Sequence, residues 1–196
     1  MSDVKHFDPD AVLDRVVRLF WRDGTAMTGI QDVVEATGLN RSSLYNTFGG
    51  KDELYIAALR RYVSSYSHPA FERLSEDGRG LDAVREFFDG LIDARCLGEY
   101  ARWGCMVANA HAGIEGSHPD VSDILLEHHR SLIAALRSAL IVAGELGQLR
   151  AEAASPDACA DHLALVAYGV NLRSRSGVPA DELRRGVDAA LAAISV

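Results

Sequence analysis

Hydrophobic residues recur along the chain three and four positions apart, which is the spacing of amphipathic helices, and no segment gives the signal of a strand. Glycine, proline and capping residues separate these amphipathic segments. The pattern predicts about nine helices, at residues 9–24, 29–37, 41–48, 51–67, 81–97, 105–114, 121–146, 154–174 and 180–194. The expected fold class is therefore all-α.

Residues 28–51 hold the most informative part of this pattern. Thr28 is expected to cap the helix that follows it, since its hydroxyl can accept a free backbone N–H. Gly38 supplies the positive φ that ends this helix, Leu39 anchors the turn, and Asn40 is a suitable N-cap for the next helix. Two short helices joined by a glycine turn predict a helix-turn-helix.

The helix predicted at residues 41–48 has one apolar face, on which Leu44 and Phe48 lie four positions apart and can dock into a core. The rest of its surface suits DNA, because Arg, Asn and Ser bond base edges while Tyr, Thr and Lys hold phosphates. Lys51 opens the next helix and can clamp a phosphate together with that helix's N-terminal N–H groups. The alternative is an ordinary helical hairpin with a solvated face. The candidate DNA contacts are Thr28, Arg41, Ser42, Ser43, Tyr45, Asn46, Thr47 and Lys51.

Residues 20–54 closely resemble the DNA-binding domain of the TetR/AcrR family of transcriptional regulators. The residues that carry the resemblance are Phe20, Trp21, Gly24, Thr28, Val33, Val34, Ala36, Gly38, Leu39, Ser43, Leu44, Tyr45, Phe48, Gly49 and Lys51. Thr25 departs from the family pattern, since many members carry Tyr or Phe there. The resemblance implies an N-terminal three-helix helix-turn-helix DNA-binding domain over residues 1–50. It also implies a C-terminal helical domain over residues 51–196 that binds a ligand and dimerises.

The last two predicted helices, the eighth and ninth, at residues 154–174 and 180–194, carry more apolar and small residues than one packed face needs. This composition suits a buried helix pair within one subunit, and it suits a subunit interface. The resemblance favours the interface, because the family dimerises by packing its last two long helices against those of the partner. A two-fold homodimer presents two recognition helices to successive major grooves, about 34 Å apart, and so reads a palindromic operator.

The net charge of -8 is unusual for a DNA-binding protein, but it is unevenly distributed. Residues 1–62 hold 8 Lys and Arg against 9 Asp and Glu, a net charge of -1, while residues 63–196 hold 12 against 19, a net charge of -7. Attraction to DNA must therefore come from the local placement of Arg41, Lys51 and Arg22. We expect few phosphate contacts and a moderate dependence of affinity on salt.

The remaining helices are expected to form the pocket for a small-molecule inducer that the resemblance implies. Ligand pockets are mostly apolar with a few polar groups, and each apolar candidate also fits a plain core position. The candidate lining residues are Phe88, Ile92, Cys96, Trp103, Cys105, Met106, Asn109, His111, Leu125, His128, His129 and Tyr168. The adjacent residues His128 and His129 point in different directions on a helix, and no second pair accompanies them, so neither a metal nor a cofactor is expected.

Cys105 supports an alternative, in which the repressor responds to oxidants or electrophiles. The segment at residues 102–109, RWGCMVAN, resembles a motif in one branch of the family, which includes regulators whose thiol at this position is the sensor. The positive end of a helix dipole favours a thiolate, and Arg102 would add to this effect. The redox-responsive type carries a lysine late in the eighth helix, where this chain has Arg175, a poor nucleophile. A buried packing role is the competing interpretation of Cys105.

The sequence disfavours other classes of protein. No apolar run approaches a membrane span, and the N-terminus, MSDVKHFDPD, is too acidic for a signal peptide, so we expect a cytoplasmic protein with no membrane partner. An enzyme is not expected, because Cys105 and His111 are about 240° apart around a helix and no G-x-S-x-G, H-E-x-x-H or phosphate loop occurs. An adaptor that keeps the helix-turn-helix only as a fold is a third possibility. The sequence thus predicts a DNA-binding transcriptional repressor that a small-molecule inducer releases from its operator.

Overall fold

The computed structural model describes residues 7–113, 118–151 and 155–196. Within these ranges the chain forms ten α-helices and one π-helical segment. Their bounds in chain order are Pro9–Met27 (α1), Ile30–Thr37 (α2), Arg41–Phe48 (α3), Lys51–Tyr62 (α4), Val63–Ser67 (η1), His68–Glu76 (α5), Leu81–Cys96 (α6), Met106–Ala112 (α7), Pro119–Glu145 (α8), Pro156–Arg175 (α9) and Ala180–Ala192 (α10). The only strand-like feature in these ranges is an isolated bridge between Leu149 and Ser195, and the all-α prediction is confirmed.

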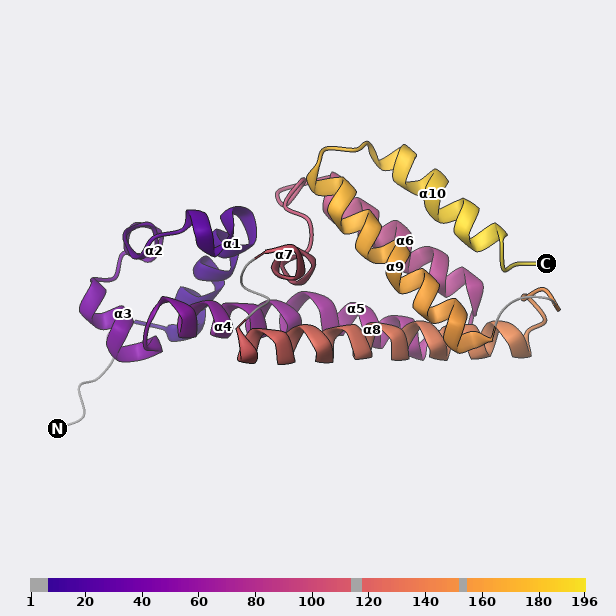
Figure 1. Ribbon diagram of the computed structural model, residues 1–196, viewed down its shortest axis with the longest axis horizontal. Coiled ribbons are helices and arrows are strands. Elements are labelled where there is room, and N and C mark those ends of the chain that lie inside the picture. The colour runs from indigo at the N-terminus through magenta and orange to yellow at the C-terminus, as the bar shows by residue number, and fades with distance from the viewer. Residues whose placement is uncertain (1–6, 114–117, 152–154) are drawn as a thin grey trace.

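The helices form two groups joined by long helical segments. Figure 1 shows α1, α2 and α3 at one end of the molecule and α6, α9 and α10 at the other, with α5 and α8 running side by side along the lower edge of the view, beneath α6, α9 and α10. The groups have separate hydrophobic cores. One core buries Phe20, Leu44 and Leu59 from the N-terminal helices together with Val107 of α7. Because α7 belongs to this first core, a shift of α7 acts directly on α1 and α4.

Helix α1 begins at the predicted residue, but its assigned end, Met27, lies beyond the predicted end at Gly24. The Asp8 carboxylate accepts the backbone N–H of Asp10 at 2.9 Å, and Pro9 occupies the first turn, where its missing N–H is not needed. Gly24, with a φ of 75°, interrupts the helical backbone three residues before the assigned end of α1. This interruption turns the chain toward α2.

The predicted helix end before Pro69 is wrong. The chain stays helical from Lys51 to Glu76, because α4 passes through the π-helical turn η1 into α5. Pro69 lies in the first turn of α5, where its missing N–H is tolerated. The predicted end at residue 114 and the predicted start at residue 154 lie outside the described residues.

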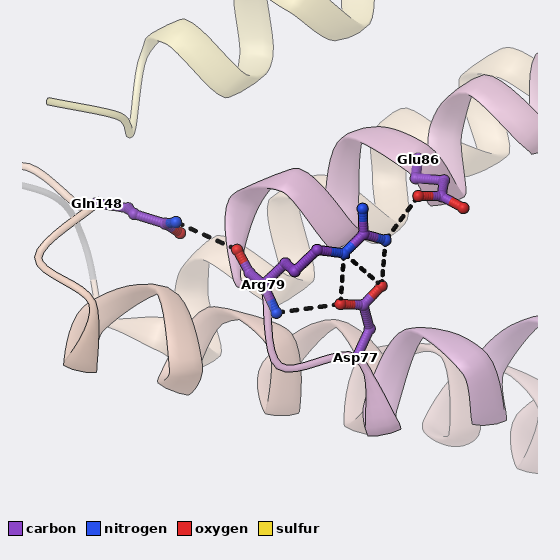
Figure 2. A network of polar contacts seen from close by, with 4 residues as sticks. All are labelled: Asp77, Arg79, Glu86 and Gln148. Atoms are coloured by element: carbon purple, nitrogen blue, oxygen red, sulfur yellow. Dashed lines mark hydrogen bonds and ion pairs between the residues drawn. The ribbon is translucent and has the colours of Figure 1, made fainter.

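A polar network fixes the turn between α5 and α6 to the end of α8 (Figure 2). The Arg79 guanidinium donates to Asp77 at 2.9 Å and to Glu86 at 2.6 Å. The Gln148 side chain donates to the Arg79 carbonyl at 3.2 Å and accepts the backbone N–H of Leu81 at 2.8 Å. Since the Arg79 side chain is about half exposed, the ion pairs mainly orient the loop and add little stability.

Candidate nucleic-acid interface and interior cavity

The turn between α2 and α3 has the geometry that the sequence predicts. Gly38 takes the left-handed conformation, with a φ of 73°, and its N–H donates to the Val34 carbonyl at 2.8 Å. The Asn40 side chain then accepts the backbone N–H of Ser43 at 2.8 Å, which caps α3. The free backbone groups at the end of α2 and at the start of α3 therefore find hydrogen-bond partners within the turn region itself.

The predicted N-cap at Thr28 is wrong. The cap position of α2 is Gly29, whose N–H donates to the Asp32 carboxylate at 2.6 Å. Thr28 is 1% exposed, and its hydroxyl donates to the Gly24 carbonyl at 2.7 Å. Thr28 therefore packs the end of α1 and is not available to hold a phosphate. The spacing of Gly29 and Asp32, a carboxylate three residues after the cap, was the signal in the sequence.

Helix α3 presents a polar surface. Leu44 is 2% exposed and Phe48 packs half-buried against the same core, as predicted. The Tyr45 side chain is 43% exposed, and Arg41 forms no ion pair with any carboxylate of the described residues. The exposed residues of α3 are Arg41, Ser42, Tyr45 and Asn46, while Ser43 and Thr47 are half-buried. These side chains keep their donors and acceptors available to an external partner.

Lys51 lies beside this surface at the start of α4. Its ammonium donates to the Thr25 carbonyl at 2.6 Å, which fixes the side chain against the end of α1 and leaves two further N–H donors. The Gly50 N–H donates to the Glu53 carboxylate at 2.7 Å. Backbone N–H groups of Glu53 and Gly50 lower the pKa of this carboxyl. The Glu53 carboxylate offsets part of the positive charge that the helix dipole places at the start of α4, so Lys51 is the main cation there.

Trp21 of α1 links the two helix groups. Its indole N–H donates to the Gly104 carbonyl at 2.8 Å, and its ring centre lies 4.9 Å from that of Tyr62 and 5.4 Å from that of Trp103. The Arg175 guanidinium from α9 donates to the carbonyls of Trp103 at 2.8 Å and of Trp21 at 3.4 Å. The end of α1 is therefore held by the loop before α7 and by α9.

An interior cavity of about 60 Å³ lies next to this link. Its walls come from α5, α6, α8, α9 and the π-helical segment η1, with Cys105 at the start of α7. Its lining is mostly apolar and includes the polar side chains of Ser67, Arg95, His128 and Asn171. The lining residues are Tyr66, Ser67, Ala70, Phe71, Phe87, Leu91, Arg95, Cys105, His128, Leu132, Ala167, Tyr168 and Asn171.

Arg95 is the charged residue of the lining, and its side chain is buried, with 9% of the residue exposed. It donates to the Asn171 side-chain carbonyl at 2.8 Å and to the Tyr62 hydroxyl at 3.0 Å. Burial raises the pKa of Tyr62 well above its usual value, so this partner stays a neutral phenol. No carboxylate in the described ranges pairs with Arg95. Its positive charge is thus compensated only by neutral groups and by the face of the Trp21 ring.

His128 of α8 lines the same cavity and is 5% exposed. Its Nε2 lies 3.1 Å from the Ser67 hydroxyl, whereas its Nδ1 is buried with no hydrogen-bond partner among the described residues. Burial, together with the positive charge of neighbouring histidines and Arg95, lowers the pKa of His128 to about 3. The ring is therefore neutral at physiological pH.

Comparison with known proteins identifies the N-terminal domain. Residues 12–58 match the family model described as bacterial regulatory proteins, tetR family. Residues 12–58 are therefore a DNA-binding domain of the tetR family type. Members of this family are DNA-binding transcriptional regulators and not enzymes, which agrees with the prediction from the sequence.

Similarity to known regulators extends beyond this domain. The uncharacterized HTH-type transcriptional regulator YezE of Bacillus subtilis (strain 168) is 26% identical over 194 residues, which cover 99% of this chain and 100% of YezE. The HTH-type transcriptional repressor ComR of Escherichia coli (strain K12) is 27% identical over 186 residues, 91% of this chain and 85% of ComR.

Solved structures of the family share the fold. A cysteine mutant of the TetR family transcriptional regulator CifR, complexed with 26-bp double-strand operator DNA, superposes with a TM-score of 0.84 at 23% identity, over 98% of this chain and 100% of that one. The reduced form of NemR from E. coli superposes with a TM-score of 0.79 at 21% identity, over 95% of this chain and 96% of that one.

Three of the residues expected to line a ligand pocket border this cavity. Cys105, His128 and Tyr168 line the cavity, whereas the other nine candidates do not. Phe88, Ile92, Met106 and Leu125 are core residues, Cys96 lies 4.0 Å from the Val178 carbonyl, Asn109 donates to the Trp103 carbonyl, and His111 and His129 contact the Tyr168 ring.

Sequence reasoning missed Ser67, Arg95 and Asn171. Ser67 lies in the helical stretch that was expected to end there. Arg95 continues the apolar stripe of α6 three residues after Ile92, and this position on the buried face was the signal available.

Cys105 is the N-cap residue of α7 and is 5% exposed. Arg102, which was expected to assist its thiol, is exposed, and Arg175 donates to backbone carbonyls. Within the part of the chain that the structure describes, no three His, Cys, Asp or Glu side chains gather in a way that would hold a metal ion. None of the described helices is long and apolar enough to cross a membrane.

Proposed function

We propose that this TetR-family regulator is a homodimeric repressor that binds a palindromic operator through two copies of α3 and leaves it when a small molecule enters the interior cavity. The observation that carries the proposal is the exposed polar face of α3 beside Lys51. ComR is named a repressor, and the CifR structure contains operator DNA, which supports the same role for this chain.

The residues of α3 divide into two roles. Arg41, Ser42 and Asn46 are exposed and chemically suited to base edges, with half-buried Ser43 as a further candidate. Tyr45, Thr47 and Lys51 position the helix through phosphates. Since residues 63–196 carry a net charge of -7, these few side chains, doubled by the dimer, supply most of the binding.

The outer faces of α9 and α10 are the proposed dimer interface. On α9, Leu165 is 68% exposed and Leu172 is 56% exposed, with Gly169 between them. On α10, Gly186 and Ala189 are exposed at helical spacing. The inner side of α9, which includes Leu163, already packs within the subunit. An exposed stripe of leucine and small residues on two adjacent helices suits close packing against a second copy.

The cavity is too small for a typical inducer as it stands. Ligand pockets usually enclose about 300–1,000 Å³, whereas this cavity measures about 60 Å³. A ligand must therefore move α6, α8 or α9 relative to α4, and Arg95 and Trp21 transmit this movement to α1. Inducer binding thus shifts the population toward a dimer whose α3 helices no longer match one operator.

Selection of bound duplexes from a random DNA pool tests the proposal. The full-length protein should enrich an inverted repeat whose half-sites are about one helical turn apart or more. Failure to enrich any sequence, or enrichment of a single asymmetric half-site, would overturn it.

A second candidate is a repressor that senses electrophiles through Cys105. The Cys105 thiol lines the cavity, and this position favours the second candidate. A covalent adduct on the thiol would occupy the space next to Arg95 and Tyr168. Mass spectrometry after exposure to an α,β-unsaturated aldehyde tests it, with Cys105→Ser as the control. Modification at Cys105 with loss of operator binding supports this candidate, and loss of binding that persists in Cys105→Ser excludes it.

A further inference from the structure

We propose that the ligand of the interior cavity is a small organic carboxylate, held by the Arg95 guanidinium and by His128 Nδ1. The inference rests on the proposed function for the role of the cavity, and it adds the chemical class of the ligand. It follows from two buried polar groups in the lining of this cavity that the protein leaves incompletely paired.

The first group is the Arg95 guanidinium. It has five N–H donors, of which one serves Asn171 and one serves Tyr62. Both acceptors are neutral, and no carboxylate of the described residues neutralises the charge. A buried charge without a counter-ion is costly, whereas a carboxylate matches the planar guanidinium with two parallel hydrogen bonds. An anion in the cavity would therefore bind most favourably beside the Arg95 guanidinium, whose charge has no counter-ion among the described residues.

The second group is the imidazole of His128. The ring is neutral, so only one of its nitrogens carries a proton. If Ser67 donates its hydroxyl proton to Nε2, the proton of the ring lies on Nδ1, which has no acceptor in the described residues. A carboxylate oxygen supplies that acceptor. Arg95 and His128 would then hold one ligand from two different helices, α6 and α8.

The shape of the cavity restricts the ligand to small acids. Its volume of about 60 Å³ is far below the roughly 300–1,000 Å³ of common ligand pockets, which favours a small acid. The lining also holds apolar side chains, among them Phe71, Phe87 and Leu132, and the Phe71 ring packs 5.1 Å from the His128 ring. A short hydrocarbon chain or one aromatic ring would lie against these apolar side chains, and its entry would force the helices apart.

Arg95 also gives the ligand a direct effect on the DNA-binding domain. Its guanidinium contacts the Trp21 ring of α1 and the Tyr62 hydroxyl of α4. A carboxylate that draws the guanidinium toward His128 loosens both contacts. Binding of the acid and release of the operator are thereby coupled.

Matched acids and amides test the proposal on the wild-type protein. Propionate and propionamide, then benzoate and benzamide, are titrated at constant ionic strength, with binding followed by tryptophan fluorescence. Each acid should bind at least about tenfold more tightly than its amide, because only the acid carries the charge that Arg95 lacks. Equal affinity of acid and amide would overturn the proposal, as would binding of inorganic phosphate at least as tight as that of the acids.

Variants locate the site. Arg95→Gln should weaken benzoate binding by at least about tenfold, Arg95→Lys should retain part of it, and Arg130→Gln, at an exposed position of α8, should leave it unchanged. Unchanged affinity in a folded Arg95→Gln protein would contradict the assignment. Operator binding by the unliganded protein is measured separately. Absence of operator binding would contradict the proposed function, whereas the comparison of acid with amide alone decides the class of ligand.

Discussion

The guanidinium carbon of Arg95 lies 5.4 Å from the centre of the Trp21 ring. Arg95 belongs to α6 and lines the interior cavity, while Trp21 belongs to α1 and packs in the core of the N-terminal helices. This contact joins the proposed sensing site to the DNA-binding domain without an intermediate residue. A change in the cavity therefore has a short physical route to α1.

Replacing Trp21 by Phe should destabilise the fold by about 1–3 kcal/mol, because the buried Gly104 carbonyl loses the indole N–H that it accepts at 2.8 Å. Urea unfolding measures the loss. Trp103→Phe is the matched control, since the indole N–H of Trp103 donates to no group of the described residues. Equal destabilisation by the two changes would show that the hydrogen bond is not the source of the effect.

Lys51→Ala and Asn46→Ala should weaken operator binding in different ways. Loss of Lys51 removes a phosphate contact, so affinity should fall about equally for all sequences and the salt slope should decrease by about 1 per subunit. Loss of Asn46 should relax base preference at one position, at a cost of about 1–3 kcal/mol for the preferred base. Titrations against the operator and its single-base variants at several salt concentrations separate the two effects. Identical changes in specificity would refute the division of roles.

The helix-turn-helix was predictable because its signals are local. Gly38, Asn40, Leu44 and Phe48 determine the turn, the cap and the packed face within a dozen residues. Thr28 was misassigned because a threonine and a glycine compete for the cap position, and the tertiary contact of Thr28 with Gly24 decided the outcome.

The cavity was less predictable, because the polar side chains of its lining come from distant parts of the chain. The buried side chain of Arg95 is held by contacts with Trp21, Tyr62 and Asn171, which belong to three other helices. The π-helical turn η1 positions Ser67, but the sequence pattern in this region indicates only a continuous α-helix that ends before Pro69. Sequence periodicity reports which face of a helix is apolar, but not which polar group a neighbouring helix supplies.

His128 should make the stability of the protein depend on pH. Its pKa is about 3 in the folded protein and about 6.5 when unfolded, so the unfolded state binds the extra proton as the pH falls below 6.5. Between pH 7.5 and pH 5 this group should lower the free energy of unfolding by about 2 kcal/mol. His128→Gln should remove that part of the pH dependence, whereas His118→Asn, at an exposed cap position, should not. A pH profile unchanged by His128→Gln would argue against a neutral, buried imidazole.

Leu172→Glu should produce a monomer. The side chain is 56% exposed on α9, and a carboxylate there would be buried without a partner in the proposed interface. Light scattering after gel filtration measures the molar mass, and Leu126→Glu, at a 46% exposed position of α8, is the control. If Leu172→Glu and Leu126→Glu are both dimeric, or both monomeric, the interface does not lie on α9 and α10 as proposed.

Fluorescence anisotropy with the selected operator tests the central claim most directly. The same labelled duplex is compared with one in which a single half-site is scrambled. A homodimer that reads a palindrome should bind the intact duplex with two protomers and lose at least about a thousandfold in affinity when one half-site is scrambled, which is the usual gap between specific and non-specific binding. Equal affinity for the two duplexes would contradict the account.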